Sequence, residues 1–236
     1  MSATRDLTAL PHFDATTPPG EIYRIGRELA GGRITMACSF SMEDIVLIEL
    51  LHSHLNDFTV FAIDTGRLNE ETCQVAEQVS QRFGVQIDWF LPDNHAVEEL
   101  ASSKGLFSFR DSLENRRECC RIRKLEPLQR AIKGASAWIT GMRREQSMTR
   151  SAQQPLEIDH VNGGLLKINP LTYWTERQVR DYAGKQHLPV NALYQQGYTS
   201  IGCAPCTRAT RDGEHARAGR WWWECDEHRE CGLHRR

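Results

Sequence analysis

The chain has 236 residues, a formal net charge of −2, eight cysteines and 40% hydrophobic residues. This hydrophobic fraction can form a core without disulfide staples, and the near-neutral charge gives no overall attraction to nucleic acid. The N-terminus lacks the charged and then apolar run of a signal peptide, and no stretch holds the roughly 18 apolar residues of a membrane helix. We therefore expect a cytoplasmic protein with no membrane partner, in which clustered cysteines indicate metal binding or catalysis.

The predicted elements alternate between strand and helix after residue 20. Residues 1–20 contain several prolines and little periodicity, and are predicted to form a flexible N-terminal arm. Apolar runs predict strands at 33–37, 59–63, 85–91 and 137–140, and helical periodicity predicts helices at 44–55, 69–83, 95–103 and 175–187. Asn162-Gly163, within 156–168, predicts a hairpin of two antiparallel strands.

This order predicts an α/β fold, with a mainly parallel sheet and helices on both faces. Ligands of such sheets bind at the carboxyl ends of the strands. The α/β domain is predicted to cover residues 21–206. Residues 207–236 are polar and rich in Arg and His, so we expect a C-terminal tail that folds over the body or moves.

Two short polar loops follow the first two predicted strands. Cys38 to Asp44 forms the first loop, and Asp64-Thr65-Gly66-Arg67 forms the second. A strand–helix turn presents backbone N–H groups and a helix N-terminus to an anion. The first loop lacks both the P-loop and the dinucleotide-binding glycine patterns, so a plain turn capped by Ser39 or Ser41 is an equal alternative for that loop alone. Two such loops at adjacent strand ends favour a nucleotide crevice.

Cationic residues are grouped locally although the net charge is small. Such groups suit a small anionic ligand, whereas any single Arg is more often a solvated surface residue. The groups are Arg116, Arg117, Arg121, Arg123 and Lys124; Arg143 and Arg144; and Arg208, Arg211, Arg217 and Arg220.

Four cysteines have an unusual layout: the adjacent pair Cys119-Cys120 and the distant pair Cys203 and Cys206. Four thiolates hold either an iron–sulfur cluster or a structural zinc ion, but zinc is typically bound by two Cys-x₂₋₄-Cys pairs and only one half has that form here. Adjacent side chains on an ideal helix point about 100° apart, so both thiols reach one site only if the backbone bends or the bound group is bulky. Pro127 is compatible with such a bend. The layout favours a cluster over zinc, and over four unligated buried thiols.

Cys231 lies in a polar segment near the C-terminus. Cationic neighbours lower the pKa of a thiol, and a mobile tail can carry a nucleophile into a site and out again. Cys231 is therefore a candidate nucleophile, with an idle exposed cysteine as the equal alternative. Its neighbours are Arg229, Gly232, His234, Arg235 and Arg236.

Four groups of residues make the chain resemble the assimilatory sulfonucleotide reductases, specifically the iron–sulfur type that reduces adenosine 5′-phosphosulfate (adenylyl sulfate). Relatives that use the 3′-phosphorylated substrate typically keep the terminal motif and lack the four cysteines, so the resemblance favours the unphosphorylated substrate. It also implies a fold similar to the pyrophosphatase-loop (adenine nucleotide alpha hydrolase-like) fold. The groups are Ser39 to Asp44 with Asp64 to Leu68; Cys119 to Lys124 with Pro127-Leu128; Gly202 to Arg208; and Gly219 to Glu224 with Glu230 to His234.

The resemblance implies reduction of adenosine 5′-phosphosulfate to sulfite and AMP, in sulfate assimilation and cysteine biosynthesis. The thiolate of Cys231 attacks the sulfur, and thioredoxin or glutaredoxin releases sulfite from the resulting S-sulfocysteine. A [4Fe-4S] cluster held by Cys119, Cys120, Cys203 and Cys206 arranges the cationic site without passing electrons. A homo-oligomer is compatible with the resemblance. The implied substrate-binding residues are Ser39, Phe40, Glu43, Asp44, Thr65, Gly66, Arg67, Lys124, Arg143, Arg144, Arg217, Arg220 and His234.

Three alternative functions remain at this stage. A reductase that uses 3′-phosphoadenosine 5′-phosphosulfate, or both nucleotides, differs only in substrate. A cluster-bearing pyrophosphatase-loop RNA thiolase would have a glycine-paired loop and a basic surface. A non-enzymatic iron–sulfur sensor would have no use for Cys231 on an Arg-rich tail.

Overall fold

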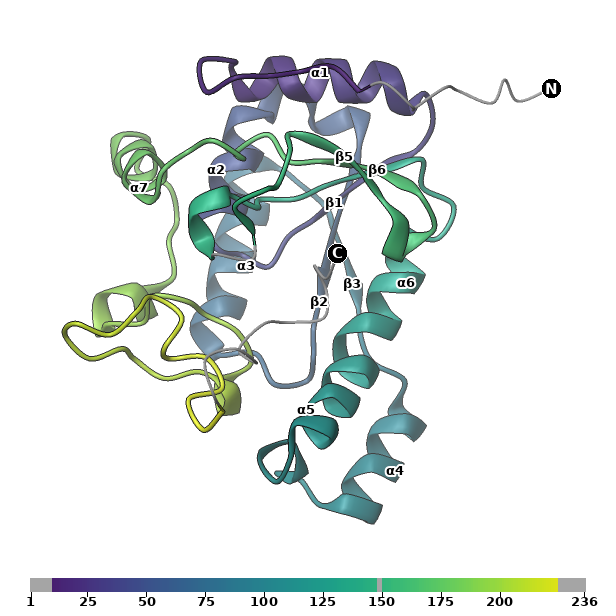
Figure 1. Ribbon diagram of the computed structural model, residues 1–236, viewed down its shortest axis with the longest axis vertical. Coiled ribbons are helices and arrows are strands. Elements are labelled where there is room, and N and C mark those ends of the chain that lie inside the picture. Colours follow the sequence, from purple (N-terminus) through teal and green to yellow (C-terminus); the bar gives the residue numbers. More distant parts are fainter. Residues whose placement is uncertain (1–9, 148–149, 225–236) are drawn as a thin grey trace.

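A six-stranded sheet forms the centre of the computed structural model, which describes residues 10–147 and 150–224 (Figure 1). The strand order is β3-β2-β1-β4-β6-β5, and every pair is parallel except β5 with β6. The mainly parallel sheet and the hairpin at Asn162-Gly163 are thus confirmed. The strands are β1 (Ile34–Ala37), β2 (Thr59–Ile63), β3 (Ile87–Phe90), β4 (Ala137–Ile139), β5 (Leu156–Asp159) and β6 (Leu165–Ile168).

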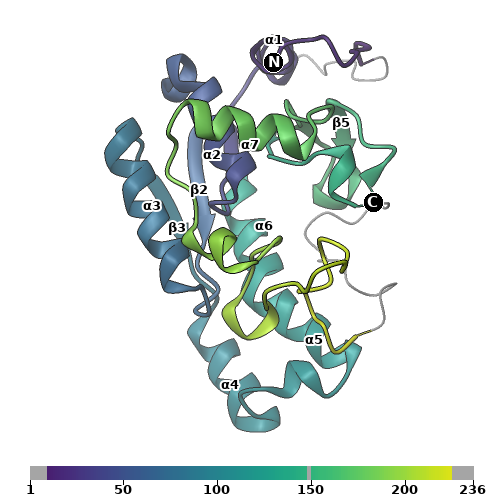
Figure 2. The same ribbon diagram turned by 90° about the vertical axis from the view of Figure 1, so that its left-hand side faces the viewer.

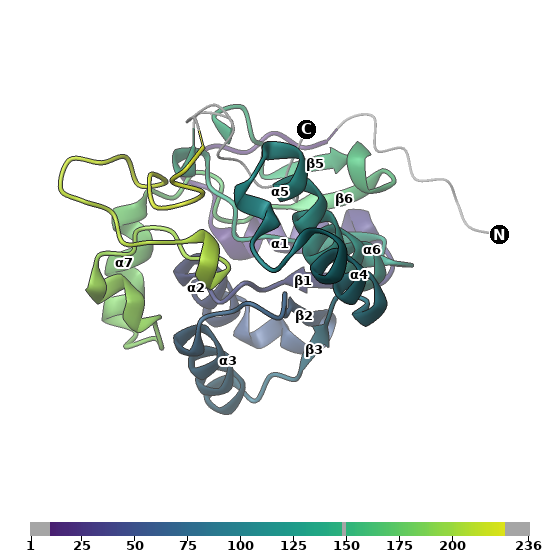
Figure 3. The same ribbon diagram turned by 90° about the horizontal axis from the view of Figure 1, so that it is seen from below.

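Helices cover both faces of this sheet (Figure 3). Because successive strand residues point to opposite faces, Val60 joins the larger core under α1, α2, α3 and α7, while Phe61 joins the smaller core under α6. The described helices are α1 (Pro19–Ala30), α2 (Met42–Leu50), α3 (Glu70–Phe83), α4 (Asn94–Lys104), α5 (Leu113–Cys120), α6 (Glu126–Ile132) and α7 (Glu176–Lys185).

Of the flexible arm predicted for residues 1–20, the structure describes residues 10–20. Helix α1 begins at Pro19, a residue suited to the first helical turn, and ends before Gly31 in the left-handed conformation (φ 53°). Phe13 is buried in the larger core, and its carbonyl accepts a hydrogen bond from the Tyr173 hydroxyl at 2.8 Å. The described part of the arm is therefore packed against the domain.

The cysteine pair ends α5, where the helix changes its geometry. Arg121–Leu125 forms a π-helical turn that leads directly into α6. Pro127 lacks the N–H that an α-helix would direct to the carbonyl of Arg123, which favours this wider turn. Of the two possibilities that the sequence left open, a bent backbone or a bulky bound group, the structure shows an irregular turn before Pro127, and the helix continues through Pro127.

The carboxyl ends of β1 and β4 lie side by side where the strand order changes direction, since β1 leads to β2 on one side and β4 leads to β6 on the other. Such a point in an open α/β sheet leaves a crevice for ligands. The segment that follows α7 returns to this end of the sheet (Figure 2). There the backbone N–H of Ala204 donates to the carbonyl of Arg67 at 2.8 Å, and Asn69 Nδ2 donates to the carbonyl of Gly202 at 3.0 Å.

No helix in the described ranges, 10–147 and 150–224, is long and apolar enough to cross a membrane.

Candidate active site

A cavity of about 260 Å³ opens at this switch point. Phe61, Ile63 and Trp138 contribute apolar wall, and the loops after β1, β2 and β4 contribute polar groups. The segment after α7 closes the other side with Ser200 to Cys203. A mostly apolar cavity with a few directed polar groups is typical of a small-molecule site.

Asp44 organises the loop after β1. Its Oδ2 accepts hydrogen bonds from the backbone N–H and the hydroxyl of Ser39, both at 2.7 Å. Burial raises the pKa of the Asp44 carboxyl to about 6, with the hydrogen bonds from Ser39 opposing the shift. A Cβ atom at position 141 would lie 2.5 Å from Asp44 Oδ1, so Gly141 lets the loop after β4 approach this carboxylate. Neither Ser39 nor Ser41 caps α2 with its side chain in the described structure.

Phe40 has the left-handed backbone conformation (φ 59°), which is strained for an aromatic residue. Its buried ring packs against Trp89, with 5.6 Å between the ring centroids. The ring thereby fixes the turn, while the residue as a whole lines the cavity with Ser39 and Ser41.

Four cationic side chains line the cavity in the part of the chain that the structure describes: Lys124, Arg150, Arg217 and Arg220. Lys124 comes from the π-helical turn. Arg220 Nη1 donates to the Ile201 carbonyl at 3.1 Å, and a Cβ atom at position 202 would lie 2.4 Å from Arg220 Nη2. Gly202 therefore allows this guanidinium to lie against the cysteine segment. Three of these cations were predicted, but Arg150 was missed because nothing in its local sequence distinguishes it from a surface arginine.

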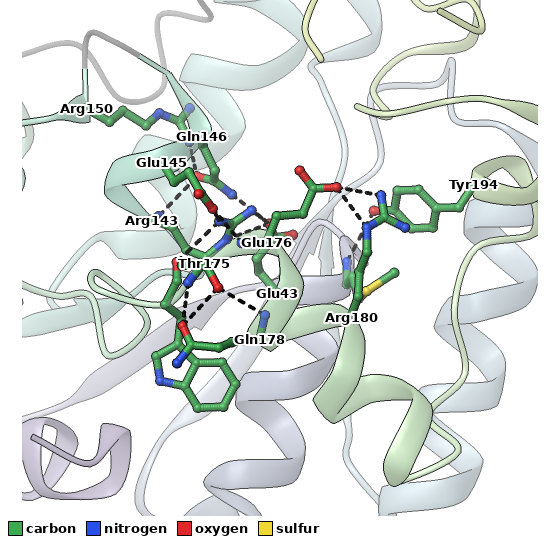
Figure 4. Close-up of polar contacts among 12 residues, drawn as sticks. Glu43, Arg143, Glu145, Gln146, Arg150, Thr175, Glu176, Gln178, Arg180 and Tyr194 are labelled. Carbon is green, nitrogen blue, oxygen red and sulfur yellow. Dashed lines mark hydrogen bonds and ion pairs between the residues drawn. The ribbon is translucent and has the colours of Figure 1, made fainter. Parts of the chain in front are cut away.

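Three residues predicted to bind the substrate, Glu43, Arg143 and Arg144, make contacts with other parts of the protein. Arg143 is 4% exposed, and its Nη2 donates to Glu43 Oε1 at 2.8 Å (Figure 4). Arg144 donates through Nε to the carbonyl of Gln153 at 2.6 Å, and its guanidinium carbon lies 4.5 Å from the centroid of the Tyr173 ring. None of the three is among the described residues that line the cavity, and their contact with the substrate stays a prediction.

The loop after β2 is divided between two cavities. Thr65 lines the nucleotide-sized cavity, whereas Arg67 lines a second, smaller cavity beside it. The guanidinium carbon of Arg67 lies 4.9 Å from the centroid of the Phe109 ring, and Arg67 Nη2 donates to the carbonyl of Leu106 at 2.6 Å. Gly66 has φ 68° and makes the turn between Thr65 and Arg67. Gly66 and Arg67 are outside the described lining of the first cavity, and their contact with the substrate stays a prediction.

All four of the singled-out cysteines line the second cavity. Lys124 and Cys203 line both cavities, so the two sites share a wall. Cys119, Cys203 and Cys206 are buried and Cys120 is half-buried. Further cationic residues, Arg116 and Arg123, also line this cavity and were not assigned to it from the sequence.

The cationic surroundings act on the thiols unequally. Burial alone would raise the pKa of the Cys203 thiol. The charges of Lys124 and Arg220 and the 3.3 Å contact between Thr65 Oγ1 and Cys203 Sγ outweigh burial and bring this pKa below its ordinary value. Burial raises the pKa of Cys206 to about 12. Metals are ligated by thiolates, and burial disfavours the thiolate form. Iron binding by these four cysteines therefore requires positive charge that stabilises their thiolates.

This donor set fits an iron–sulfur cluster in its chemistry, because four cysteines converge on one cavity beside cationic side chains. Within the described ranges, no group of three or more His, Cys, Asp or Glu side chains is arranged to hold a single metal ion. Iron binding therefore remains a prediction about the residues Cys119, Cys120, Cys203 and Cys206.

Trp221 lines the second cavity and contacts one arginine from the lining of each cavity. Its buried ring has the guanidinium carbons of Arg116 and Arg220 at 4.5 and 4.6 Å from the ring centroid. Arg116 in turn pairs through Nε with Glu224 Oε1 at 2.6 Å, and both side chains are buried. The described part of the predicted tail is thereby fixed onto the domain beside α5. Cys231 and His234 lie outside the described residues.

A mainly parallel sheet covered on both faces, with a cavity at its switch point, defines an open-sheet α/β protein that binds its ligand at the carboxyl ends of the strands. Yeast FAD synthetase in complex with FAD shares this fold at a TM-score of 0.51 and 17% sequence identity, covering 84% of this chain and 70% of that chain. The predicted fold class is thus confirmed.

The model of the phosphoadenosine phosphosulfate reductase domain matches residues 33–209, and the chain belongs to this family of sulfonucleotide reductases. Adenosine 5′-phosphosulfate reductase of Allochromatium vinosum is 49% identical over 203 residues, which are 86% of this chain and 79% of the relative. A crystal structure of phosphoadenylyl-sulfate reductase from Candida auris in a phosphate complex matches with a TM-score of 0.68 and 27% identity, covering 82% of this chain and 91% of that chain.

Proposed function

We propose that this enzyme reduces adenosine 5′-phosphosulfate to sulfite and AMP. The observation that carries the proposal is the wall shared by the two cavities, in which Lys124 and Cys203 face both a cationic nucleotide-sized site and the four-cysteine site. The Allochromatium vinosum relative, named for this substrate, supports it further.

The phosphosulfate would be bound by the four cations Lys124, Arg150, Arg217 and Arg220. Cationic donors both hold the anion and stabilise the charge that develops on the departing phosphate. Ser39, Phe40 and Thr65 would contact the nucleotide from the strand ends. Asp44 and Glu43 would act indirectly, the first by fixing Ser39 and the second through its bond to Arg143.

Cys231 supplies the nucleophile in this proposal. Its thiolate attacks the sulfur of the sulfo group, a bond from Cys231 Sγ to that sulfur forms, and the bond from sulfur to the bridging oxygen breaks with its electron pair going to AMP. An enzyme S-sulfocysteine remains, so one difficult step is divided into two. The cations of the cavity lower the barrier by pairing with the phosphate as it leaves.

A thiolate of thioredoxin or glutaredoxin then attacks Cys231 Sγ. Sulfite leaves with the electron pair of the sulfur–sulfur bond, and the second thiol of the reductant resolves the mixed disulfide. Two electrons thus pass from the dithiol to the substrate sulfur. A reducing cytoplasm, where dithiol reductants are maintained, is the compartment that fits this chemistry.

A [4Fe-4S] cluster, when held by Cys119, Cys120, Cys203 and Cys206, would supply a fixed charged group to the cavity that these cysteines line together with Lys124. The residues of this chain then have separate tasks: the four thiols hold the group, and Arg116 and Arg123 offset the charge of the thiolates. Lys124 keeps its place between the two cavities.

Comparison of two nucleotides tests the proposal. With excess thioredoxin, we expect kcat/KM for adenosine 5′-phosphosulfate to exceed that for its 3′-phosphorylated form by at least about a hundredfold, a difference of about 2.7 kcal/mol. The physical basis is the set of four cysteines beside the cationic site, which the resemblance associates with the unphosphorylated substrate. Sulfite formation from equal concentrations of the two nucleotides is the measurement. Equal or faster turnover of the 3′-phosphorylated form would establish the alternative reductase instead.

A further inference from the structure

Gln146 lies on the cavity wall beside Arg150, and its amide is fixed at both ends. The amide Oε1 accepts hydrogen bonds from Arg150 Nη1 and, at 3.1 Å, from the backbone N–H of Arg143. The amide Nε2 donates to Glu43 Oε1 at 3.0 Å (Figure 4). Two donors face the oxygen and a carboxylate faces the nitrogen, so only one orientation of this amide satisfies its neighbours.

The turn that carries Gln146 is held by contacts with two helices. Arg143 donates to Glu43 Oε1 through Nε at 3.0 Å and through Nη2 at 2.8 Å, and the two side chains are 4% and 13% exposed. Arg143 Nη1 also donates to the carbonyl of Trp174 at 3.3 Å, and Glu145 accepts from the backbone N–H of Glu176 at 2.5 Å. The turn is therefore tied to the start of α2 and to the start of α7.

A neutral acceptor suits the position next to Arg150. An arginine side chain loses considerable rotamer freedom when it binds an anion, and a fixed acceptor removes part of that cost beforehand. A carboxylate in the same place would hold the guanidinium equally well, but it would neutralise the charge and repel the substrate. The amide oxygen of Gln146 orients Arg150 and leaves its positive charge available to the phosphosulfate.

We infer that Gln146 is a positioning residue. Its amide is held by Glu43 and by the backbone N–H of Arg143, and it fixes Arg150 in the orientation in which the guanidinium binds the anionic end of the substrate. The inference rests on the proposed function, since it takes the phosphosulfate as the anion that Arg150 meets.

The test compares full-length Gln146→Met, Gln146→Glu, Arg150→Met and the double variant Gln146→Met/Arg150→Met. Two kinds of measurement are made. Kinetics give the KM and kcat for adenosine 5′-phosphosulfate, and calorimetry gives the dissociation constant of ADP, which carries two adjoining anionic groups and is not a substrate for reduction. We expect Gln146→Met to raise both KM and the ADP dissociation constant about tenfold with kcat within twofold, and Gln146→Glu to raise them further.

The double variant carries the decisive comparison. If Gln146 acts through Arg150, adding Gln146→Met to Arg150→Met changes ADP binding by less than twofold. The matched control is Gln154→Met, the same substitution at an exposed glutamine that is outside the described lining of the cavity and whose amide donates to the carbonyl of Ala152 at 3.3 Å. It should leave ADP binding within twofold of wild type, and thermal unfolding confirms that each variant is folded.

Three results would overturn the inference: unchanged ADP binding in Gln146→Met, effects of Gln146→Met and Arg150→Met that multiply in the double variant, or a loss in Gln154→Met equal to that in Gln146→Met. A wild-type chain that binds ADP but forms no sulfite contradicts the proposed function alone, because the ADP measurements still report on Gln146.

Discussion

Replacing Cys231 by Ser is expected to reduce sulfite formation by at least about a thousandfold while the visible absorbance of the iron–sulfur chromophore is retained. A serine hydroxyl cannot replace a thiolate as a nucleophile toward the sulfo group, nor can it form the sulfur–sulfur bond that the reductant cleaves. The residues that line the four-cysteine cavity are unchanged in this variant, so iron content should match that of the wild type. Sulfite release and iron are measured on the same preparation.

Cys225→Ser is the matched control for that variant, since Cys225 is a second cysteine of the C-terminal segment, six residues before Cys231. We expect it to keep at least half of the wild-type kcat. Sulfite formation by Cys231→Ser at a rate near wild type would remove Cys231 from the mechanism, and equal losses in both variants would indicate a shared structural requirement for the segment.

Replacing Cys203 by Ser is expected to remove both iron and activity. Cys203 is 7% exposed, lines both cavities, and its Sγ lies 3.3 Å from Thr65 Oγ1. A hydroxyl is a poor iron ligand in place of a thiolate, so the iron content should fall from about four atoms per chain to less than one. The loss of the group next to Lys124 should lower kcat/KM by at least about a hundredfold, measured anaerobically together with iron and labile sulfide.

Cys73→Ser serves as the control for that loss. Cys73 is exposed on α3, outside the described lining of either cavity, and its replacement should leave iron and activity unchanged. Circular dichroism separates loss of the cluster from loss of the fold. Replacing Cys120, which is half-buried, by Ser provides a second variant of a predicted iron ligand. A folded, iron-free Cys203→Ser variant with full activity would contradict an obligatory cluster.

The sheet could be predicted from the sequence because its strands are short apolar runs between polar loops. Helix α5 and the π-helical turn after it were not predicted, and the buried Arg116 and Arg123 explain why: charged residues at buried positions hide the apolar periodicity from which a helix is recognised. Those arginines are buried because their partners come from distant segments. Arg116 pairs with Glu224, and Arg123 Nη1 donates to the carbonyl of Thr65 at 2.7 Å.

The candidate site also contains residues that could be predicted from the sequence and residues that could not. The four cysteines could be assigned to one place from their spacing, and the structure does bring them to one cavity. The roles of arginines could not be assigned, because the partner of Arg143 is Glu43, a hundred residues earlier, and only the folded chain shows that this pair turns away from the cavity. Gln146 and Arg150 carry no local signal and become candidates only through the cavity they line.

The central claim is that Cys231 takes up the sulfo group of the substrate. The most direct measurement exposes the anaerobically purified, cluster-containing chain to adenosine 5′-phosphosulfate without a reductant, and maps the added mass by peptide analysis. The account predicts one sulfo group on Cys231 and one AMP released per chain, with the adduct lost and sulfite formed when thioredoxin is added. Release of AMP with no adduct, or an adduct on another cysteine, would contradict it.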